Sequence, residues 1–581
     1  MKKLLSLLKP YRRALIIVAI TDALGMLMSL FMPYVMSLIV DRGIAGKDIA
    51  LILGAALLML MLSGLSLASN LIANKVNTRV TTGYTADVCR LTFEKINSLS
   101  YKDYSRLGPS GLLTRATDDI FNIEGAASSL VYTLVTVPIM LFGSAVLSFM
   151  ADPQLSLVFI LGIVPVIAVI FFFTKPLYAM WDKSDYYVDE QNKIVRERLS
   201  GLRVVRAFNN EAREHGRAKF ATEEMAKYII RANVRGGYVE PLAMLLLNIA
   251  TVVMVAVAGD RAAAGLLDNA GDIIAIIQYV ALISGALLNL SWTIAWLPRL
   301  RVSIKRIGEI YALPDEESPR GESPADDGVG YTLELKDVSF SYPDSQESVL
   351  KNVSMTIKEG ERVAIIGGTG SGKTTLVRLL LSFFDATSGE IFIGERAYSE
   401  LDKSAIRRHF SPALQRAMIF EGTLRDNVRM GSAGADDGEI MSALSDCAME
   451  EFAASHEEGL DYLLVGMGRN VSGGQRQRLN MARAVIRDAD VYIFDDSFSA
   501  LDFLTESIIR ERLAVRLAGK TEITVTQRVS TAMSAERIYV MDAGRIVGVG
   551  THAELFGSCD IYREICLSQL GSDSVGGDAR G

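Results

Sequence analysis

Six long apolar runs in the first 300 residues constrain the fold of this 581-residue chain more than any other feature. A helix needs ~20 consecutive apolar residues to cross the hydrocarbon core of a bilayer, and each run has about that length. A soluble stalk or coiled coil would carry charges throughout, whereas these runs are nearly free of them. The predicted spans are residues 14–40, 49–73, 128–150, 155–173, 241–259 and 273–296.

Two long connections separate the second span from the third and the fourth from the fifth. Residues 76–122 and 177–236 carry many charges, few Pro or Gly, and the apolar spacing typical of helices. They hold most of the Lys and Arg of this half, as does the segment 1–13. The positive-inside rule then predicts a cell membrane protein, in a bacterium the inner membrane, with both termini and both connections in the cytoplasm.

The composition excludes some partners. Hydrophobic residues make up 50% of the chain and charged residues 22%, but these averages conceal an apolar N-terminal half and a polar C-terminal half. The net charge of -7 gives no electrostatic case for binding nucleic acid.

The four cysteines lie far apart and are interpreted as reduced thiols. Asp22 is the one acid well inside a span, and its role stays open.

Residues 313–330 mark a domain boundary. They are rich in Pro, Gly and acids and lack apolar periodicity, which is typical of a linker. Beyond them, predicted strands and helices alternate as in an α/β domain. The sequence therefore predicts a membrane domain at 1–312, a linker at 313–330, an α/β domain at 331–570 and a flexible tail at 571–581.

A glycine-rich phosphate loop opens the α/β domain. The apolar strand Arg362–Ile366 leads into a segment that fits G-x-x-x-x-G-K-[ST], and a helix is predicted at 376–381. In such a loop the glycines let backbone N–H groups surround phosphates, the lysine neutralises them, and the hydroxyl that follows can bind Mg²⁺. The candidate phosphate-binding residues are Gly367, Gly368, Thr369, Gly370, Ser371, Gly372, Lys373, Thr374 and Thr375.

A second motif occupies residues 471–502. It opens with the turn Ser472, Gly473, Gly474, Gln475 before a predicted helix, whose N-terminus can bind an anion. It closes with a strand at 491–494 followed by Asp495 and Asp496. Adjacent carboxylates at the end of a buried strand are costly unless a cation such as Mg²⁺ lies beside them. Taken alone, a capped helix followed by a core strand explains the same pattern.

With these motifs in this order, the chain resembles an ATP-binding cassette (ABC) exporter half-transporter over nearly its whole length. The resemblance implies an all-α six-helix transmembrane domain, of the type I ABC exporter kind, fused to an α/β P-loop nucleotide-binding domain. It implies ATP and Mg²⁺ as cofactors, a lipid bilayer, and a second half-transporter as partner. The implied activity is ATP hydrolysis coupled to efflux of a small hydrophobic or amphipathic substrate, which can be a drug, lipid or peptide.

The resemblance also assigns roles to individual residues. Tyr342 matches the aromatic residue that stacks on adenine, and Gln415 matches the Q-loop glutamine that contacts Mg²⁺ and the attacking water. The signature, residues 472–475, caps the γ-phosphate held by the opposite subunit, and residues 499–502, ending at Asp502, match the D-loop. Without the family register, a strand tyrosine and a surface glutamine would be the simpler interpretations. The implied Mg²⁺ ligands are Thr374, Gln415 and Asp495.

Two positions depart from the family pattern. Asp496 stands where the family has the glutamate that activates the lytic water, and loss of one methylene withdraws the carboxylate by more than ~1 Å, which can cost ~100-fold in rate. Gln527 stands at the position of the switch histidine, and an amide cannot become cationic. This pairing resembles one subunit of heterodimeric bacterial multidrug-type exporters, in which one site binds ATP but hydrolyses it poorly.

Other interpretations stay open at this level. The chain can be a homodimeric exporter that tolerates Asp496, or an ATP-gated regulator that does not transport. An inactive relic is a further alternative, but the phosphate loop, signature and D-loop are all intact. The signature and D-loop matter only in a closed dimer around ATP, which counts against the non-transporting regulator. Apolar spans without a distinctive charge pattern do not select a substrate.

Overall fold

The computed structural model describes residues 4, 6–264, 269–316, 331–343, 345 and 347–570. The chain divides into two compact units, of which the first comprises Met1–Asn97 and Leu107–Leu313 and the second Ser98–Arg106 and Pro314–Gly581. Most of the predicted linker, residues 317–330, and the predicted tail, 571–581, lie outside the described residues. Each unit is therefore considered by itself.

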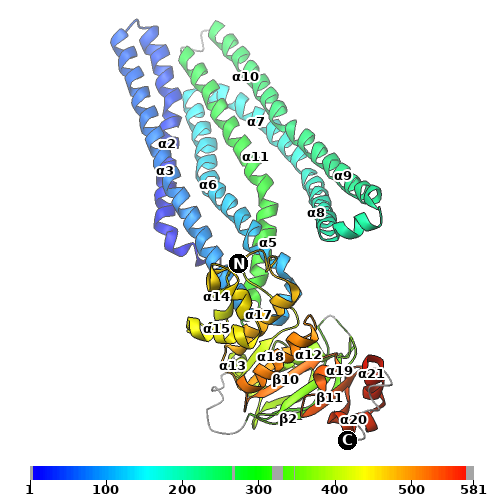
Figure 1. Cartoon of the computed structure of the whole chain (residues 1–581). Coiled ribbons are helices and arrows are strands. Elements are labelled where there is room, and N and C mark those ends of the chain that lie inside the picture. The colour runs from blue at the N-terminus through cyan, green and yellow to red at the C-terminus, as the bar shows by residue number, and fades with distance from the viewer. Residues whose placement is uncertain are drawn as a thin grey trace. The chain divides into compact units, whose positions relative to one another are not determined.

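Every regular element described in the first unit is helical (Figure 1). Six of its described helical segments are long and apolar enough to cross a membrane, which confirms the predicted six spans. A 3₁₀ turn (Lys9–Tyr11) precedes α2, and a π-helix (Ile39–Ile44) follows it. The α-helices are α2 (Arg12–Leu38), α3 (Ile49–Asn97), α5 (Pro109–Ala116), α6 (Asp118–Ala151), α7 (Pro153–Thr174), α8 (Leu177–Ala207), α9 (Glu211–Gly237), α10 (Val239–Ala263) and α11 (Ala270–Ala312).

The spans pack pairwise and leave large apolar side chains outside. Helix α2 lies along α3, α6 along α11, and α7 along α10. Leu30 and Tyr279 are buried between helices, and the Tyr279 hydroxyl donates to the Leu30 carbonyl. By contrast, Leu60 and Phe142 are exposed. Exposed apolar side chains on helices of this length are what lipid covers in a bilayer.

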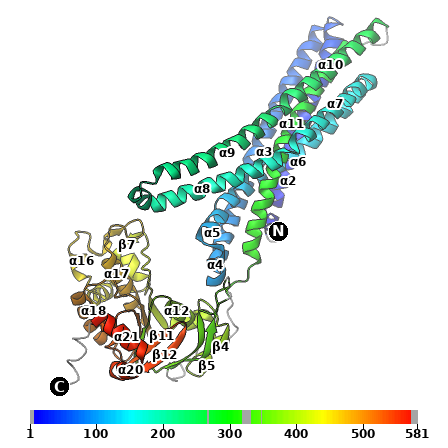
Figure 2. The ribbon, with the colours of Figure 1, turned by 90° about the vertical axis from the view of Figure 1, so that its right-hand side faces the viewer.

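The predicted long connections are helical. Helices α8 and α9 run side by side as a pair (Figures 1 and 2). In the first connection, α3 continues to Asn97 before two short helices, α4 (Tyr101–Leu107) and α5. An ion pair between Arg217 and Glu197, at 3.1 Å, joins the two polar helices α8 and α9. The charged periodicity therefore corresponds to helices that pack on each other rather than to loops.

The second unit contains an antiparallel sheet and a larger, mainly parallel sheet (Figure 2). The first has the order β2-β1-β4-β5 and the second β12-β11-β3-β10-β9-β6, and β7 pairs with β8. The strands are β1 (Leu333–Phe340), β2 (Leu350–Ile357), β3 (Arg362–Ile366), β4 (Ser388–Ile393), β5 (Arg396–Ala397), β6 (Phe410–Ala413), β7 (Gly422–Thr423), β8 (Leu463–Leu464), β9 (Val491–Asp495), β10 (Thr521–Thr526), β11 (Arg537–Asp542) and β12 (Arg545–Gly550).

Helices alternate with these strands, as the sequence predicted for an α/β domain. Two 3₁₀ turns, Tyr398–Glu400 and Gly459–Asp461, also occur. The α-helices are α12 (Lys373–Leu380), α13 (Lys403–Arg408), α14 (Leu424–Arg429), α15 (Asp437–Asp446), α16 (Glu450–Ala454), α17 (Gly473–Val485), α18 (Phe503–Arg516), α19 (Val529–Ala532), α20 (His552–Ser558) and α21 (Asp560–Leu570).

Parallel pairing brings the carboxyl ends of the central strands to one edge of the sheet. Strand β10 pairs in parallel with β3 and β9, and β6 pairs in parallel with β9. In this register Val525 lies beside Asp495, and Thr526 lies beside Ile366. In open α/β sheets, ligands bind outside the carboxyl ends of the strands. This edge is therefore where the predicted phosphate loop and carboxylates meet.

The short segment Ser98–Arg106 belongs to the second unit, although it lies within residues 1–312. The ring of Tyr101 in this segment stacks on Phe383 with centroids 4.9 Å apart and meets the edge of Phe384 at 5.5 Å. The backbone N–H of Glu316 donates to the carbonyl of Ser98 at 2.7 Å. Packing of this partly buried ring holds the start of α4 against the second unit.

Candidate functional site

A cavity of about 240 Å³ lies at the carboxyl edge of the parallel sheet. It brings together the phosphate loop, the Q-loop glutamine, both carboxylates and the switch position, which are far apart in the sequence. It is lined by Val349, Thr369, Gly370, Ser371, Gly372, Lys373, Thr374, Thr375, Gln415, Asp495, Asp496, Val525, Thr526 and Gln527.

The phosphate loop depends on its glycines for its shape. Gly370 and Gly372 have φ of 83° and 102°, in the left-handed region that favours glycine. A Cβ on Gly367 would lie 2.2 Å from the carbonyl oxygen of Met541, too close for any side chain. At Gly368 a Cβ would meet nothing within 4 Å. Tight packing therefore fixes the start of the loop, and left-handed backbone fixes its end.

The Lys373 ammonium lies inside this loop. It donates to the carbonyl oxygens of Gly367 at 2.7 Å and Gly368 at 2.8 Å, and the side chain is buried. Burial lowers the pKa of Lys373, and the nearby carboxylates of Asp496 and Asp495 oppose that shift. A buried cation surrounded by loop backbone suits a phosphate ligand, which would supply the negative charge.

Asp495 ends β9 with its side chain buried. Burial, and after it the neighbouring Asp496, raise the pKa of Asp495 to about 6. Lys373 and the backbone N–H of Gln415 act in the opposite direction. A divalent cation would stabilise the ionised form. With Lys373 and Thr374 in the same cavity, these residues fit a nucleotide phosphate with Mg²⁺.

Asp496 leaves the strand through a left-handed turn. Its φ is 51°, a conformation that aspartate tolerates better than most residues. Its backbone N–H donates to the carbonyl of Val525 at 2.8 Å, and the Ser499 hydroxyl donates to its carbonyl at 2.7 Å. The turn therefore directs the second carboxylate into the cavity by a route that differs from that of Asp495.

Gln527 directly follows β10 and lines the same cavity. Its side-chain oxygen accepts a hydrogen bond from the Thr369 hydroxyl at 3.3 Å. The side chain of Gln569, on α21, donates to the Gln527 carbonyl at 2.7 Å and accepts from the Val529 N–H at 2.9 Å. Gln569 thus holds the backbone of the switch segment, residues 527–529, and sequence reasoning missed it.

Tyr342 lies beside the phosphate-loop helix but does not line the cavity. Its hydroxyl is hydrogen-bonded to the Thr375 hydroxyl at 3.0 Å and accepts from Arg378 at 2.9 Å. Its ring meets the edges of Phe340 and Phe384. The predicted contact with adenine stays a proposal.

The signature forms a capped helix start. The hydroxyl of Ser472 accepts from the Gln475 N–H at 3.2 Å, and the Gln475 side chain accepts from the Ser472 N–H at 2.7 Å. This capping box begins α17. None of the four signature residues lines the cavity that holds the phosphate loop. The structure therefore separates the signature from the other predicted site residues of the same chain.

The D-loop, residues 499–502, lies against the signature helix. A Cβ on Gly474 would come within 3.3 Å of the Ala500 carbonyl. Gln477, another residue that sequence reasoning missed, accepts from the Ala500 N–H at 3.0 Å and donates to the Ser499 hydroxyl at 3.4 Å. Asp502 caps α18 by accepting from the Thr505 N–H, and this bond lowers the pKa of Asp502.

Comparisons with known proteins match both units. The family described as "ABC transporter transmembrane region" matches residues 15–287, and that described as "ABC transporter" matches residues 350–499. An uncharacterized ABC transporter ATP-binding protein of Mycobacterium tuberculosis is 34% identical over 98% of both chains. An ATP-dependent lipid A-core flippase of Bordetella avium is 29% identical over 93% of this chain and 91% of its own.

A solved structure has the same fold. The structure of a bacterial Atm1-family ABC exporter with ATP bound matches with a TM-score of 0.82, covering 96% of this chain and 98% of that chain at 22% identity. The chain therefore belongs to the ABC transporters, and it is a multi-pass membrane protein of the exporter type that carries its transmembrane region and its ATP-hydrolysing domain in one polypeptide.

Proposed function

We propose that this chain is the degenerate-site half of a heterodimeric ABC exporter, which couples ATP binding and hydrolysis to efflux of a hydrophobic or amphipathic substrate. One observation carries the proposal. Asp496 and Gln527 line the same cavity as an intact phosphate loop. They occupy the two positions where the family has glutamate and histidine. The residues for holding ATP are therefore complete, whereas those for activating water are altered.

The binding residues have distinct tasks in this proposal. Lys373 and the backbone N–H groups of residues 367–375 hold the phosphates, and Tyr342 stacks on adenine. Thr374, Gln415 and Asp495 hold Mg²⁺, which would shield the developing phosphate charge. Gln415 and Asp495 line the same cavity, and the backbone N–H of Gln415 lowers the pKa of that carboxyl group, which supports a shared cation site.

Asp496 and Gln527 explain why hydrolysis in this site is expected to be weak. A general base must lie within hydrogen-bond reach of the water that it activates. Asp496 is one methylene shorter than glutamate, and its left-handed backbone fixes where its side chain begins. Gln527 can donate one amide hydrogen bond to a phosphate oxygen, but it cannot add positive charge as an imidazolium can.

The signature of this chain serves the other site. Residues 472–475 and the D-loop, including Asp502, would complete a site built mainly from a partner's phosphate loop, glutamate and histidine. The position of the signature outside the chain's own cavity supports this assignment. The partner would be a second ABC half-transporter, different from this chain.

The orientation and substrate are also proposals. The basic long connections favour a cytoplasmic nucleotide-binding domain and cytoplasmic termini, in a bacterial inner membrane. The relative named a lipid A-core flippase is similar over most of the chain, and it favours an amphipathic lipid among the substrate classes of drug, lipid and peptide. A substrate panel, measured as stimulation of the ATPase activity of the assembled exporter, would identify the class.

The test compares the purified chain alone with the assembly that it forms with its partner. We expect little ATP hydrolysis by the single chain and a large rise when the partner is added. Asp496→Ala in this chain should leave most of that activity, because the competent site uses the partner's base. Robust turnover by the single chain as a homodimer would contradict the heterodimer.

Two alternative functions make different predictions. A homodimeric exporter would hydrolyse ATP when this chain is purified without a different partner chain, and Asp496→Ala would abolish that hydrolysis. An ATP-gated regulator would bind ATP without moving any substrate. The discriminating experiment is ATP-dependent uptake into inverted vesicles by the reconstituted assembly. Under our proposal uptake is lost with Lys373→Ala, whereas a regulator gives no uptake with any member of the substrate panel.

A further inference from the structure

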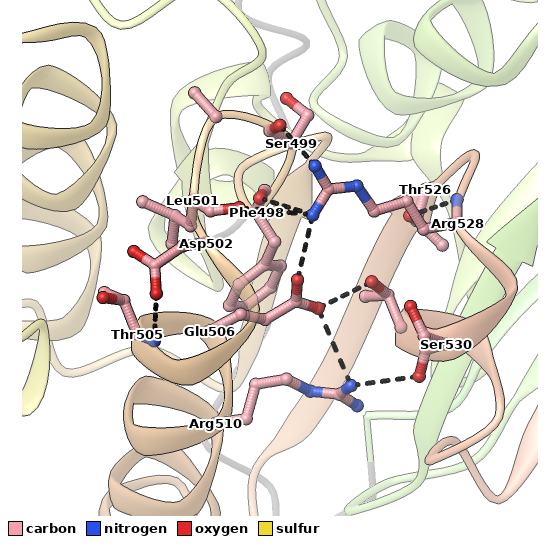
Figure 3. A network of polar contacts seen from close by, with 12 residues as sticks. Phe498, Ser499, Leu501, Asp502, Thr505, Glu506, Arg510, Thr526, Arg528 and Ser530 are labelled. Carbon is pink, nitrogen blue, oxygen red and sulfur yellow. Dashed lines mark hydrogen bonds and ion pairs between the residues drawn. The ribbon is translucent and has the colours of Figure 1, made fainter.

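The guanidinium of Arg528 ties the D-loop region to the switch segment. Arg528 directly follows Gln527, and it donates to the carbonyl oxygen of Ser499 at 2.7 Å (Figure 3). It also donates to the carbonyls of Phe498 and Leu501, each at 3.4 Å. One side chain of the switch segment thus binds three carbonyls of the turn between β9 and α18. Charge-assisted bonds of this kind are stronger than neutral ones.

Glu506 fixes the guanidinium in place. This carboxylate is 5% exposed, and it accepts from Arg528 at 3.2 Å and from the Thr531 hydroxyl at 2.7 Å. Arg510 lies 3.9 Å from the same carboxylate and donates to the Ser530 carbonyl at 3.5 Å (Figure 3). A buried carboxylate with several partners holds each of them strongly, because losing one leaves charge uncompensated.

The D-loop is held from a second side by the signature helix. Gln477 bonds the Ala500 N–H and the Ser499 hydroxyl, at 3.0 and 3.4 Å. The Ser499 hydroxyl also reaches the carbonyl of Asp496. The D-loop is therefore hydrogen-bonded both to the signature helix and to the switch segment.

We propose that Arg528, held by Glu506, is a positioning residue that couples the D-loop to the switch segment. This coupling holds the D-loop in position at the partner's nucleotide site, which the signature and D-loop of this chain complete. The inference rests on the proposed function, since it requires the signature and D-loop to serve a second chain. It predicts that Arg528 sets the rate of turnover at that site and not the affinity for ATP.

The experiment uses the full-length chain in its native assembly, purified from its own membranes through an affinity tag. Arg528→Met keeps the side-chain length but removes every hydrogen-bond donor of the side chain. Arg528→Lys keeps the positive charge but loses the planar guanidinium and its several N–H groups. Glu506→Gln keeps the shape but removes the charge of the carboxylate. Arg545→Met is the matched control, because Arg545 is an exposed arginine on β12 of the same unit. Readouts are kcat and KM for ATP, and the melting temperature.

For Arg528→Met we expect kcat to fall by roughly tenfold to a hundredfold, since misplacement by ~1 Å can cost that much, with KM within about twofold of wild type. Arg528→Lys should recover part of kcat, Glu506→Gln should give an intermediate kcat, and Arg545→Met should match wild type. If Arg528→Met does not fold, the same split between kcat and KM is read from Arg528→Lys.

The outcomes separate this inference from the proposed function. If the wild-type assembly hydrolyses no ATP, the proposed function fails and the inference falls with it. If wild type turns over and both Arg528 variants keep its kcat, the inference alone fails. A parallel loss of melting temperature and ATP affinity in Arg528→Lys, without a selective loss of kcat, would make Arg528 a structural residue and also overturn the inference.

Discussion

The hydroxyl of Thr369 donates a hydrogen bond to the side-chain oxygen of Gln527 at 3.3 Å, which joins the phosphate loop to the switch position in the lining of the cavity. Because the amide oxygen is already used, the amide N–H₂ is the part of Gln527 left to face a phosphate. Gln527 can then donate a hydrogen bond to the nucleotide while its side chain stays uncharged. The contact is consistent with a site that binds ATP but hydrolyses it slowly.

Lys373 should dominate nucleotide affinity. Lys373→Met keeps the length of the side chain but removes the buried cation and its bonds to the Gly367 and Gly368 carbonyls. We expect ATP binding by the single chain to weaken by at least ~100-fold, since a buried charged contact is worth about 3 kcal/mol. Binding is measured by isothermal titration calorimetry. Lys351→Met, at an exposed position on β2, should bind as wild type does.

The raised pKa of Asp495 predicts a pH dependence of metal binding. Burial places this pKa at about 6, so the carboxyl group is protonated below that pH and ionised above it. Because Mg²⁺ needs the ionised form, its apparent affinity should be constant above about pH 7 and fall by up to ~10-fold per unit below about pH 6. Calorimetric titration of Mg²⁺-ATP, corrected with metal-free ATP, measures this step.

Asp495→Asn is the control for the pH dependence. It lacks the titrating group, so it should bind Mg²⁺-ATP weakly and without a step between about pH 5 and about pH 7. An affinity of the wild-type chain that does not change across this range would contradict the assignment of Asp495 as a metal ligand.

Gly367, the first residue of the phosphate loop, should tolerate no side chain. Gly367→Ala places a Cβ 2.2 Å from the Met541 carbonyl, and the backbone must shift to accommodate it. Overpacking of this kind costs ~1–3 kcal/mol, which lowers the melting temperature of the nucleotide-binding unit by roughly 5 °C. Gly368→Ala meets open space and should melt as wild type does. Equal melting temperatures for the two variants would contradict the packing described here.

Two substitutions of Ser472 separate its role as a helix cap from its role in the proposed partner site. Ser472→Ala removes the bond to the Gln475 N–H and should cost ~1 kcal/mol of stability. Ser472→Asp keeps a capping acceptor but adds negative charge where a phosphate would bind. The native assembly with Ser472→Asp should therefore melt near wild type but hydrolyse ATP at least ~10-fold more slowly. Turnover at the wild-type rate by this variant would contradict the assignment of the signature to the partner's nucleotide site.

Strands and spans followed closely from local patterns. The predicted strand 362–366 is β3, and the predicted strand 491–494 is β9 without its last residue. Both are short apolar runs that end at glycine or acid, which local propensity and burial already determine. The sixth span was predicted to end at residue 296, but α11 continues to Ala312. Hydropathy marks the bilayer core, whereas helix-forming charged residues such as Arg301 and Glu309 extend the helix beyond it.

The contacts that position the site could not be predicted in the same way. The left-handed backbone of Asp496 lies in the turn between β9 and α18, and no spacing in the sequence reports it. Gln477, Arg528 and Gln569 act through partners 22 to 42 residues away, which only the packed sheet brings together. Family motifs located most of the residues that line the cavity, but not Val349, Val525 and Thr526. They also did not locate the side chains that hold the lining residues in place.

The most direct test of the central claim is ATP hydrolysis by the purified single chain before and after its two altered positions are restored. Asp496→Glu with Gln527→His gives a homodimer the missing base and switch beside an intact signature. We predict that the wild-type chain is near background and that the double variant hydrolyses ATP at least ~10-fold faster. Asp496→Asn with Gln527→His keeps a side chain that suits the left-handed turn and should stay at background. Robust wild-type turnover, unchanged in the double variant, would contradict the account.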